Sequence, residues 1–144
     1  MSEMTKDEIK KFLLQGTFTG KLGTINKDGT PHVVPIWYTV DEEDKIIFNT
    51  GDKSVKAKNI RRDNRVRLCI DDQTPLFSFV TIDGIAELIS REPGELYKWA
   101  KIIAARYMGN DMSEVYGRRN SAEGELLIKI KPVRVIGQKN IAKW

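Results

Sequence analysis

The sequence predicts a mainly β fold, namely a six-stranded antiparallel β-barrel with helices at its periphery. Strands joined by short turns predominate over helices, and the predicted order is helix, three strands, helix, two strands, helix and strand. A small barrel is the economical arrangement for such strands because closure leaves few unpaired strand edges.

The first helix is defined by a capping box. Thr5 stands where the N-cap is expected and Glu8 follows three residues later, so each side chain can bond the backbone amide of the other residue. We predict a helix over residues 6–14, and Gly16 ends it.

Three strands are predicted to follow this helix, and they cover residues 20–26, 31–40 and 45–50. The polar residues 27–29 end in glycine and indicate a hairpin between the first two strands. Pro35 lies within the second strand and has no backbone N–H to donate. That strand is therefore expected at a sheet edge or at a bulge.

The second half of the chain adds two helices and three strands. The helices are predicted over residues 55–62 and 93–108, and the strands over residues 66–71, 77–89 and 124–136. Gly84 lies inside the longest of these strands and indicates a bend. Ser90 is a candidate N-cap for the last helix.

The composition is that of a soluble globular chain. Its 144 residues suit one domain, 1–144, and the 40% of hydrophobic residues excludes a disordered protein. Cys69 is the only cysteine, so neither an intramolecular disulfide nor a cysteine-based metal site is expected. The charged N-terminus lacks the apolar core of a signal peptide, and no segment approaches the roughly 20 apolar residues of a membrane span. We therefore predict a cytoplasmic location.

The positive charge is concentrated in one segment. Residues 52–67 carry seven basic and two acidic side chains, a net charge of +5, whereas the whole chain carries +4. Such a segment suits an anionic partner, which could be a nucleotide-like cofactor, a nucleic acid or a membrane surface. A solvated helix face is the alternative, and no nucleic-acid recognition motif accompanies the charge.

The most specific pattern is the start of the predicted helix at residue 55. Thr50 ends a strand, a glycine-containing loop follows, and Ser54 starts the helix. Free backbone N–H groups and the positive end of the helix dipole make such a start a site for a phosphate. Lys56 adds a positive charge, and Asn59 lies on the same helix face. The alternative is an ordinary capped helix with surface lysines.

A second pattern surrounds Pro35 in residues 29–38. A strand interrupted by proline can expose backbone groups to the edge of a flat heterocycle, with Trp37 nearby for stacking. The alternative is a barrel strand with core aromatic residues. His32 is the only histidine, so any histidine-dependent catalytic set would require it, and no second histidine supports a metal site. We interpret His32 as a structural or substrate-proximal residue. Further polar and aromatic residues could line a pocket or decorate a helical segment, namely Tyr107, Tyr116, Arg118 and Arg119.

Taken together, these segments resemble the pyridoxamine 5′-phosphate oxidase-like FMN-binding split-barrel family. The resemblance begins at residues 20–25 (GKLGTI) and 28–38 (DGTPHVVPIWY). It continues through residues 48–51 (FNTG), 56–63 (KAKNIRRD), 80–88 (VTIDGIAEL) and 131–137 (KPVRVIG). It implies a split barrel that forms a homodimer with two cofactor sites at the interface.

The resemblance also implies the cofactor-binding residues. A flavin or deazaflavin ring would lie along the strand that contains Val33, Val34, Pro35, Ile36 and Trp37. The cofactor phosphate would be held by Thr50, Ser54 and Lys56, with Asn59 beside them. No catalytic acid or base is identified by the resemblance.

The resemblance is greatest to the branch that uses the deazaflavin coenzyme F420. Val55 stands where many relatives have arginine, and the extended C-terminal segment of the true pyridoxamine phosphate oxidases is not seen. We therefore expect an oxidoreductase that transfers a hydride between F420 and a small unsaturated or quinone-like substrate. The alternatives are an FMN-dependent oxidoreductase or flavin reductase, and a non-catalytic flavin- or haem-binding protein.

Overall fold

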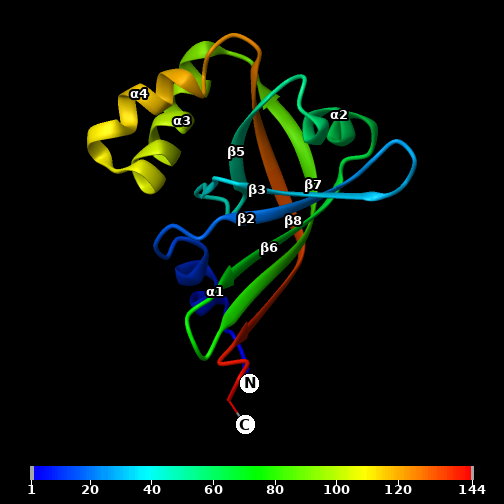
Figure 1. The fold of residues 1–144 in the computed structure, drawn as a ribbon, viewed down its shortest axis with the longest axis vertical. Coiled ribbons are helices and arrows are strands. Elements are labelled where there is room, and N and C mark those ends of the chain that lie inside the picture. The colour runs from blue at the N-terminus through cyan, green and yellow to red at the C-terminus, as the bar shows by residue number, and fades with distance from the viewer. Residues whose placement is uncertain (1, 144) are drawn as a thin grey trace.

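A curled antiparallel sheet forms the body of the molecule in the computed structural model, which describes residues 2–143 (Figure 1). Its strands are β1 (Ser2–Glu3), β2 (Gly20–Ile25), β3 (Pro31–Ile36), β4 (Thr39–Val40), β5 (Ile46–Gly51), β6 (Arg65–Asp72), β7 (Ser78–Ser90) and β8 (Glu125–Lys139). Their order across the sheet is β3-β2-β6-β7-β8-β5-β4, and β1 pairs with the far end of β8. The predicted mainly β barrel is confirmed.

The described residues form more strands than the six predicted. The segment expected to be one strand over residues 31–40 is interrupted at Trp37 and Tyr38, so it becomes β3 and β4. At this interruption the Trp37 ring stacks on Tyr107 of helix α3 (Pro93–Met108), and the backbone amide of Tyr38 donates to the Tyr107 hydroxyl at 3.3 Å. The path across the sheet therefore has seven strands, and the two-residue β1 adds a short pairing.

Four α-helices surround the sheet in the described part of the chain. They are α1 (Lys6–Leu13), α2 (Val55–Arg62), α3 (Pro93–Met108) and α4 (Ser113–Arg119), with a short 3₁₀ turn, η1 (Asn110–Met112), between the last two. In Figure 1, α3 and α4 lie together at one end of the sheet, whereas α1 lies near the two termini. No helix among residues 2–143 has the length and apolar character required to cross a membrane.

Helix α1 begins as the sequence predicts. The amide of Glu8 donates to Thr5 Oγ1 at 3.2 Å, and the amide of Thr5 donates to Glu8 Oε1 at 3.0 Å. These two bonds complete the capping box. Phe12 and Leu13 then face the core.

The predicted cap of α3 is wrong by two residues. Glu92 is the N-cap, and its carboxylate accepts from the amides of Gly94 at 2.9 Å and Glu95 at 2.7 Å. Pro93 occupies the first helical position, where a missing N–H costs nothing, so the cap falls immediately before it. Ser90 instead accepts the amide of Glu92 at 2.9 Å.

No helix was assigned in advance over the residues of α4, although a helical segment was one alternative for Tyr116, Arg118 and Arg119, and the sequence of α4 explains why. Gly117 lies in its middle, and glycine lowers the helix propensity of so short a segment. The structure gives a packing reason for this glycine. A Cβ atom at Gly117 would lie 3.1 Å from the Lys101 Cα atom, so the glycine permits close contact with α3.

The two faces of the sheet bury different clusters. The inner face is filled by fully buried side chains, among them Leu22, Tyr38, Ile46, Phe48, Leu68, Ile70, Ile82, Leu126, Ile128 and Ile130. On the outer face, Ile47 and Leu127 pack against Leu96 and Trp99 of α3. Helix α3 therefore covers the outer side of β5 and β8, and the candidate site lies beside this contact.

Pro35 and Gly84 have the positions that the sequence predicts. Strand β3 is at the sheet edge, and Pro35 pairs with Lys21 of β2. At Gly84, the pairing of β7 with β8 changes register, which marks a bulge. A Cβ atom there would lie 2.5 Å from Ile130 Cγ2, so the two strands approach as closely as they do because the residue is glycine.

Candidate functional site

The start of α2 has the geometry expected of an anion site. Ser54 is the N-cap, and its Oγ atom accepts from the amide of Ala57 at 3.2 Å. The hydroxyl oxygens of Thr50 and Ser54 lie 3.0 Å apart, so one hydroxyl donates to the other. The amides of residues 55 and 56 have no acceptor within the helix, as at any helix start. These groups can donate to an oxyanion.

Lys56 is the cation beside this helix start. Its side chain is half-buried, and burial lowers the pKa of its ammonium group, while the charge of Glu125 acts in the opposite direction. Among the described residues, no carboxylate lies within 4.0 Å of Lys56 Nζ, and no hydrogen bond satisfies it. A half-buried ammonium group without a protein partner is suited to an anionic ligand.

Most of the other positive charge in residues 52–67 has partners within the protein. The arginine contacts are Arg61 to the Asp52 carbonyl at 2.9 Å, Arg62 to the Ile25 carbonyl at 2.8 Å, Arg65 to Asp63 at 2.7 Å and Arg67 to Asp83 at 2.6 Å. Lys53 and Lys58 are exposed. The basic segment is therefore largely structural, and Lys56 differs from the other basic residues in being half-buried without a partner.

Asn59 lies on the side of α2 that faces the sheet. It is 3% exposed, and its Nδ2 group donates to Thr24 Oγ1 at 3.0 Å and to Asn26 Oδ1 at 2.9 Å. Its Oδ1 atom accepts from Arg62 at 2.7 Å. These bonds attach α2 to β2 and to the turn that follows it, so the polar atoms of Asn59 have partners within the protein.

A cavity of about 290 Å³ connects Lys56 with the end of β3. Its lining comes from six elements and comprises Pro35, Ile36, Trp37, Asn49, Lys56, Ala100, Ile103, Arg119, Asn120 and Glu125. The predicted residues Pro35, Ile36, Trp37 and Lys56 are therefore brought together. Val33 and Val34 lie farther along β3, and Val33 is 62% exposed. Thr50 and Ser54 lie at the helix start that adjoins this cavity.

Trp37 is fixed in the cavity wall by two tyrosines. Its ring stacks on Tyr107 with centroids 5.2 Å apart and planes 4° apart, and it meets Tyr116 edge-on at 6.3 Å. The Tyr107 hydroxyl donates to the Phe18 carbonyl at 2.8 Å. Aromatic residues of α3 and α4 therefore hold the ring that closes one side of the cavity.

Arg106 fastens this end of α3 to the barrel. Its guanidinium donates to the carbonyls of Leu13 at 2.9 Å, Gly16 at 3.0 Å and Tyr38 at 2.9 Å. It also lies over the ring of Tyr38, with 4.7 Å between the guanidinium carbon and the ring centroid. Burial raises the pKa of the Tyr38 phenol to about 12, although Arg106 acts in the opposite direction.

Sequence reasoning did not identify three polar residues of the cavity, namely Asn49, Asn120 and Glu125. The Asn49 Oδ1 and Glu125 Oε2 atoms are buried without a hydrogen-bond partner among the described residues. Burial raises the pKa of the Glu125 carboxyl, and Asp52 adds to this, while Lys56 and Arg119 oppose it. A polar residue inside the hydrophobic stretch of residues 46–50 was the available signal for Asn49.

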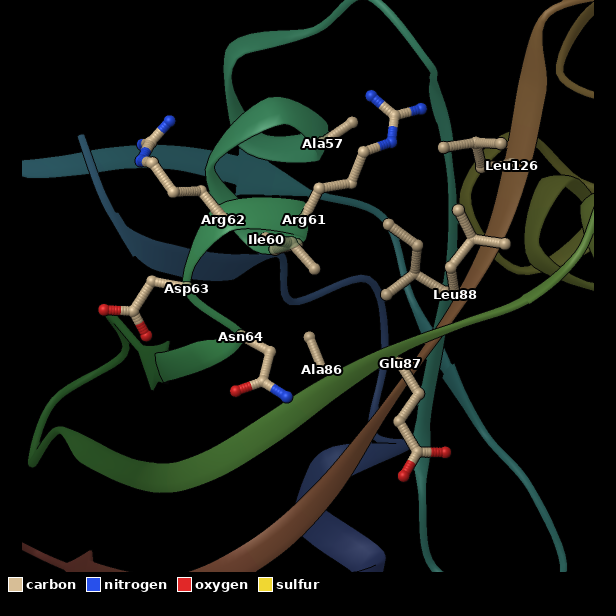
Figure 2. Close-up of a pocket in the computed structure, with 11 residues that line it drawn as sticks. Ala57, Ile60, Arg61, Arg62, Asp63, Asn64, Ala86, Glu87, Leu88 and Leu126 are labelled. Atoms are coloured by element: carbon tan, nitrogen blue, oxygen red, sulfur yellow. The ribbon is translucent and has the colours of Figure 1, made fainter. Parts of the chain in front are cut away.

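A second, larger cavity of about 580 Å³ lies between α2 and β7. Figure 2 shows Ile60, Ala86, Leu88 and Leu126 on its apolar side, with Arg61 extended above them. Strand β6 pairs with β7 only as far as Ile85, so the last residues of β7 have a free edge on this side. This part of the surface combines an apolar floor with an unpaired strand edge.

Comparison with known proteins shows which family this sequence is related to. The sequence matches the pyridoxamine 5′-phosphate oxidase family over residues 5–139. The chain belongs to this family. The family resemblance found in the sequence is therefore confirmed.

One characterised relative is a reductase. The 5a,11a-dehydrotetracycline/5a,11a-dehydrooxytetracycline reductase of Streptomyces rimosus is 37% identical over 71 residues, which cover 47% of this chain and 49% of the relative. The alignment thus spans about half of that relative.

Two solved structures share the fold over most of their length. A conserved hypothetical protein of Mycobacterium tuberculosis is 29% identical with a TM-score of 0.82, covering 95% of this chain and 86% of the other. An F420 reductase is 23% identical with a TM-score of 0.72, covering 87% and 94% of the two chains. The likeness to the F420 reductase shows that the two chains share a fold.

Proposed function

We propose that this protein is an oxidoreductase that binds F420 and transfers a hydride between this cofactor and a small unsaturated or quinone-like substrate. The observation that carries the proposal is Lys56, a half-buried cation without a protein partner, at the start of a capped helix and beside an aromatic cavity. These groups suit a ligand that joins an anionic group to a flat ring.

The phosphate of the cofactor would be held at the start of α2. Lys56 supplies the charge, and the hydroxyls of Thr50 and Ser54 supply hydrogen bonds from the adjoining residues. Asn59 would position the helix start, because its bonds to Thr24 and Asn26 fix α2 against the end of β2. The free amides of residues 55 and 56 complete the set.

The ring would lie against the end of β3. Pro35, Ile36 and Trp37 line the cavity there, and Val33 and Val34 would extend the same surface outward. When bound, a deazaflavin supplies the hydride transfer, and the protein supplies position and electrostatics. Trp37, held by Tyr107 and Tyr116, would exclude water from one side of the ring.

Two observations favour F420 over FMN. Val55 occupies a position where many relatives carry arginine, so one phosphate-binding charge is missing. An F420 reductase also shares the fold, and the reductase of Streptomyces rimosus supports reduction as the direction of the reaction. FMN remains the second candidate because its phosphate would meet the same groups.

The proposal includes a homodimer with cofactor sites at its interface. Val33 and Val133 are 62% and 68% exposed, and the cavity of Figure 2 adds an open apolar floor. A second copy would cover such surfaces. Light scattering of the purified protein should give twice the mass of the chain, and a monomer at micromolar concentration would contradict this part.

The test is a titration of the apo-protein with F420 and FMN, followed by fluorescence. Lys56→Ala should weaken binding by about 1–3 kcal/mol if the ammonium group forms a charged hydrogen bond to the phosphate. Lys58→Ala is the matched control, because Lys58 is an exposed lysine of the same helix and should leave affinity unchanged. If neither cofactor binds at micromolar concentration, the proposal is wrong, and a haem absorption band in the purified protein would indicate the haem-binding alternative.

A further inference from the structure

Two hydrogen-bond acceptors in the cavity beside Lys56 have no donor. The Asn49 Oδ1 and Glu125 Oε2 atoms are both buried and unpartnered within residues 2–143, and both residues line this one cavity. A buried acceptor without a partner costs about 1–3 kcal/mol, and native interiors leave few of them. Two in one cavity indicate that a ligand supplies the missing donors.

The strand register places the two acceptors on the same face. In the pairing of β5 with β8, Gly51 is opposite Glu125 and Asn49 is opposite Leu127. Asn49 and Glu125 are therefore diagonal neighbours on the outer face of the sheet. Gly51 has no side chain to fill the space beside them. A Cβ atom at this position would lie in contact with Glu125, 3.8 Å from its Oε2 atom.

The orientation of the Asn49 amide is fixed by helix α3. Its Nδ2 group donates to the Leu96 carbonyl at 3.4 Å. The reverse orientation would set two oxygen atoms against each other, so Oδ1 is the atom left facing away from α3. Asn49 therefore presents an acceptor, not a donor, to a ligand.

The Glu125 carboxylate is not neutralised by a direct ion pair. Lys56 from α2, Asp52 from the loop after β5 and Arg119 from α4 all act on it electrostatically. Among the described residues, none of the cations lies within 4.0 Å of its oxygen atoms. Its acceptor capacity is thus available beside the proposed phosphate position at Lys56.

We propose that Asn49 and Glu125 bind the hydroxyl groups of the polyol chain that links the phosphate of the cofactor to its ring. This inference rests on the proposed function. The phosphate requires donors, which Lys56 and the start of α2 supply, whereas the hydroxyls next to it require acceptors. Asn49 and Glu125 are the unpartnered acceptors next to Lys56, so this pair selects ligands that carry a polyol over ligands that carry the ring alone.

The test compares two phosphate-free ligands by fluorescence titration, namely 5-deazariboflavin, which carries the polyol, and 5-deazalumiflavin, which carries a methyl group instead. The wild-type protein should prefer the polyol ligand by about tenfold or more, as expected for two hydrogen bonds of about 1 kcal/mol each. Glu125→Gln and Asn49→Leu should each reduce this preference several-fold. Glu43→Gln, at an exposed glutamate in the turn before β5, is the control and should leave the preference unchanged.

The preference is a ratio of two affinities, so a general loss of structure in a variant does not imitate the result. An unchanged preference in both variants would overturn the inference. An equal loss of affinity for both ligands would also overturn it. In that case the substituted residue would not distinguish the polyol, which only one of the two ligands carries, from the ring that both ligands share. The ¹³C resonance of the Glu125 carboxyl in the wild-type protein gives an independent measurement. It should shift on saturation with 5-deazariboflavin and not with 5-deazalumiflavin.

Failure of the proposed function would give a different result. In that case the wild-type protein would bind none of the deazaflavins, F420 or FMN, and no preference could be measured. Binding of F420 together with equal affinity for the two phosphate-free ligands would leave the proposed function intact and refute the polyol site alone.

Discussion

The inner and outer faces of the sheet are built by the same strands but differ in how their polar side chains are partnered beside the candidate site. On β5, Phe48 faces the barrel interior, whereas Asn49 faces the cavity under α3. On the inner face, the buried Tyr38 hydroxyl has a partner, because it donates to the Leu13 carbonyl at 2.5 Å. On the outer face, Asn49 and Glu125 have acceptors without donors. Strand alternation thus directs neighbouring residues to the core and to the candidate site in turn.

The largest expected effect is on the inner face. Phe48→Ala should lower the free energy of unfolding by about 3–5 kcal/mol, because it removes a fully buried ring and leaves a cavity. Urea denaturation measures this loss. A loss below about 1 kcal/mol would mean that the interior repacks easily and that the two faces do not differ as described.

A smaller loss is expected where α3 is attached to the barrel. Arg106→Met should cost about 2–3 kcal/mol, because three backbone carbonyls lose a charged donor while the aliphatic part of the side chain is kept. It should also weaken cofactor binding, since Trp37 is positioned by the neighbouring Tyr107. Full cofactor affinity in a destabilised variant would show that α3 does not position the cavity wall.

Substitution of Lys56 is expected to stabilise the apo-protein, whereas the two substitutions above destabilise it. Lys56→Met should raise the free energy of unfolding of the apo-protein by about 1 kcal/mol, because a half-buried charge without a partner is removed. Lys58→Met, at an exposed position of the same helix, should change stability by less than about 0.5 kcal/mol. If Lys56→Met instead destabilises the apo-protein, Lys56 has a structural role.

The smallest effect concerns Glu125 and depends on pH. Its folded-state pKa is raised above the ordinary value of 4.5, so the folded protein binds this proton more tightly than the unfolded chain does. The stabilisation is complete below that ordinary value and is lost as the pH rises through the folded-state pKa. Glu125→Gln should therefore be more stable than wild type at pH 7, by less than about 1 kcal/mol. The two proteins should converge near pH 4, and an equal difference at both pH values would exclude a role for ionisation.

The features that could be predicted from sequence are those set by neighbouring residues. The Thr5 capping box and the helix start at Ser54 follow from side chains that bond amides two or three residues away. Pro35 could be placed at an edge because its missing N–H restricts any strand that contains it. The site needed more than this, because Trp37, Lys56 and Glu125 meet only through tertiary packing.

Other features depend on contacts that no local pattern records. The spacing of Asn59 from Lys56 predicts a shared helix face, but it does not say that Asn59 bonds to Thr24 and Asn26 of the neighbouring strand segment. The polar atoms of Asn49 and Glu125 are significant because they lack partners in the fold, and a missing partner has no signature in the sequence.

The bulge at Gly84 has a consequence for how far this sequence can change. Any side chain at position 84 would collide with Ile130 and with the Lys131 carbonyl, which a Cβ atom would approach to 3.0 Å. The clash could be relieved only by separating β7 from β8, the strand that also carries Glu125. In a library that samples every substitution, position 84 should therefore accept almost none. The exposed Glu87, three residues away on the same strand, should accept most.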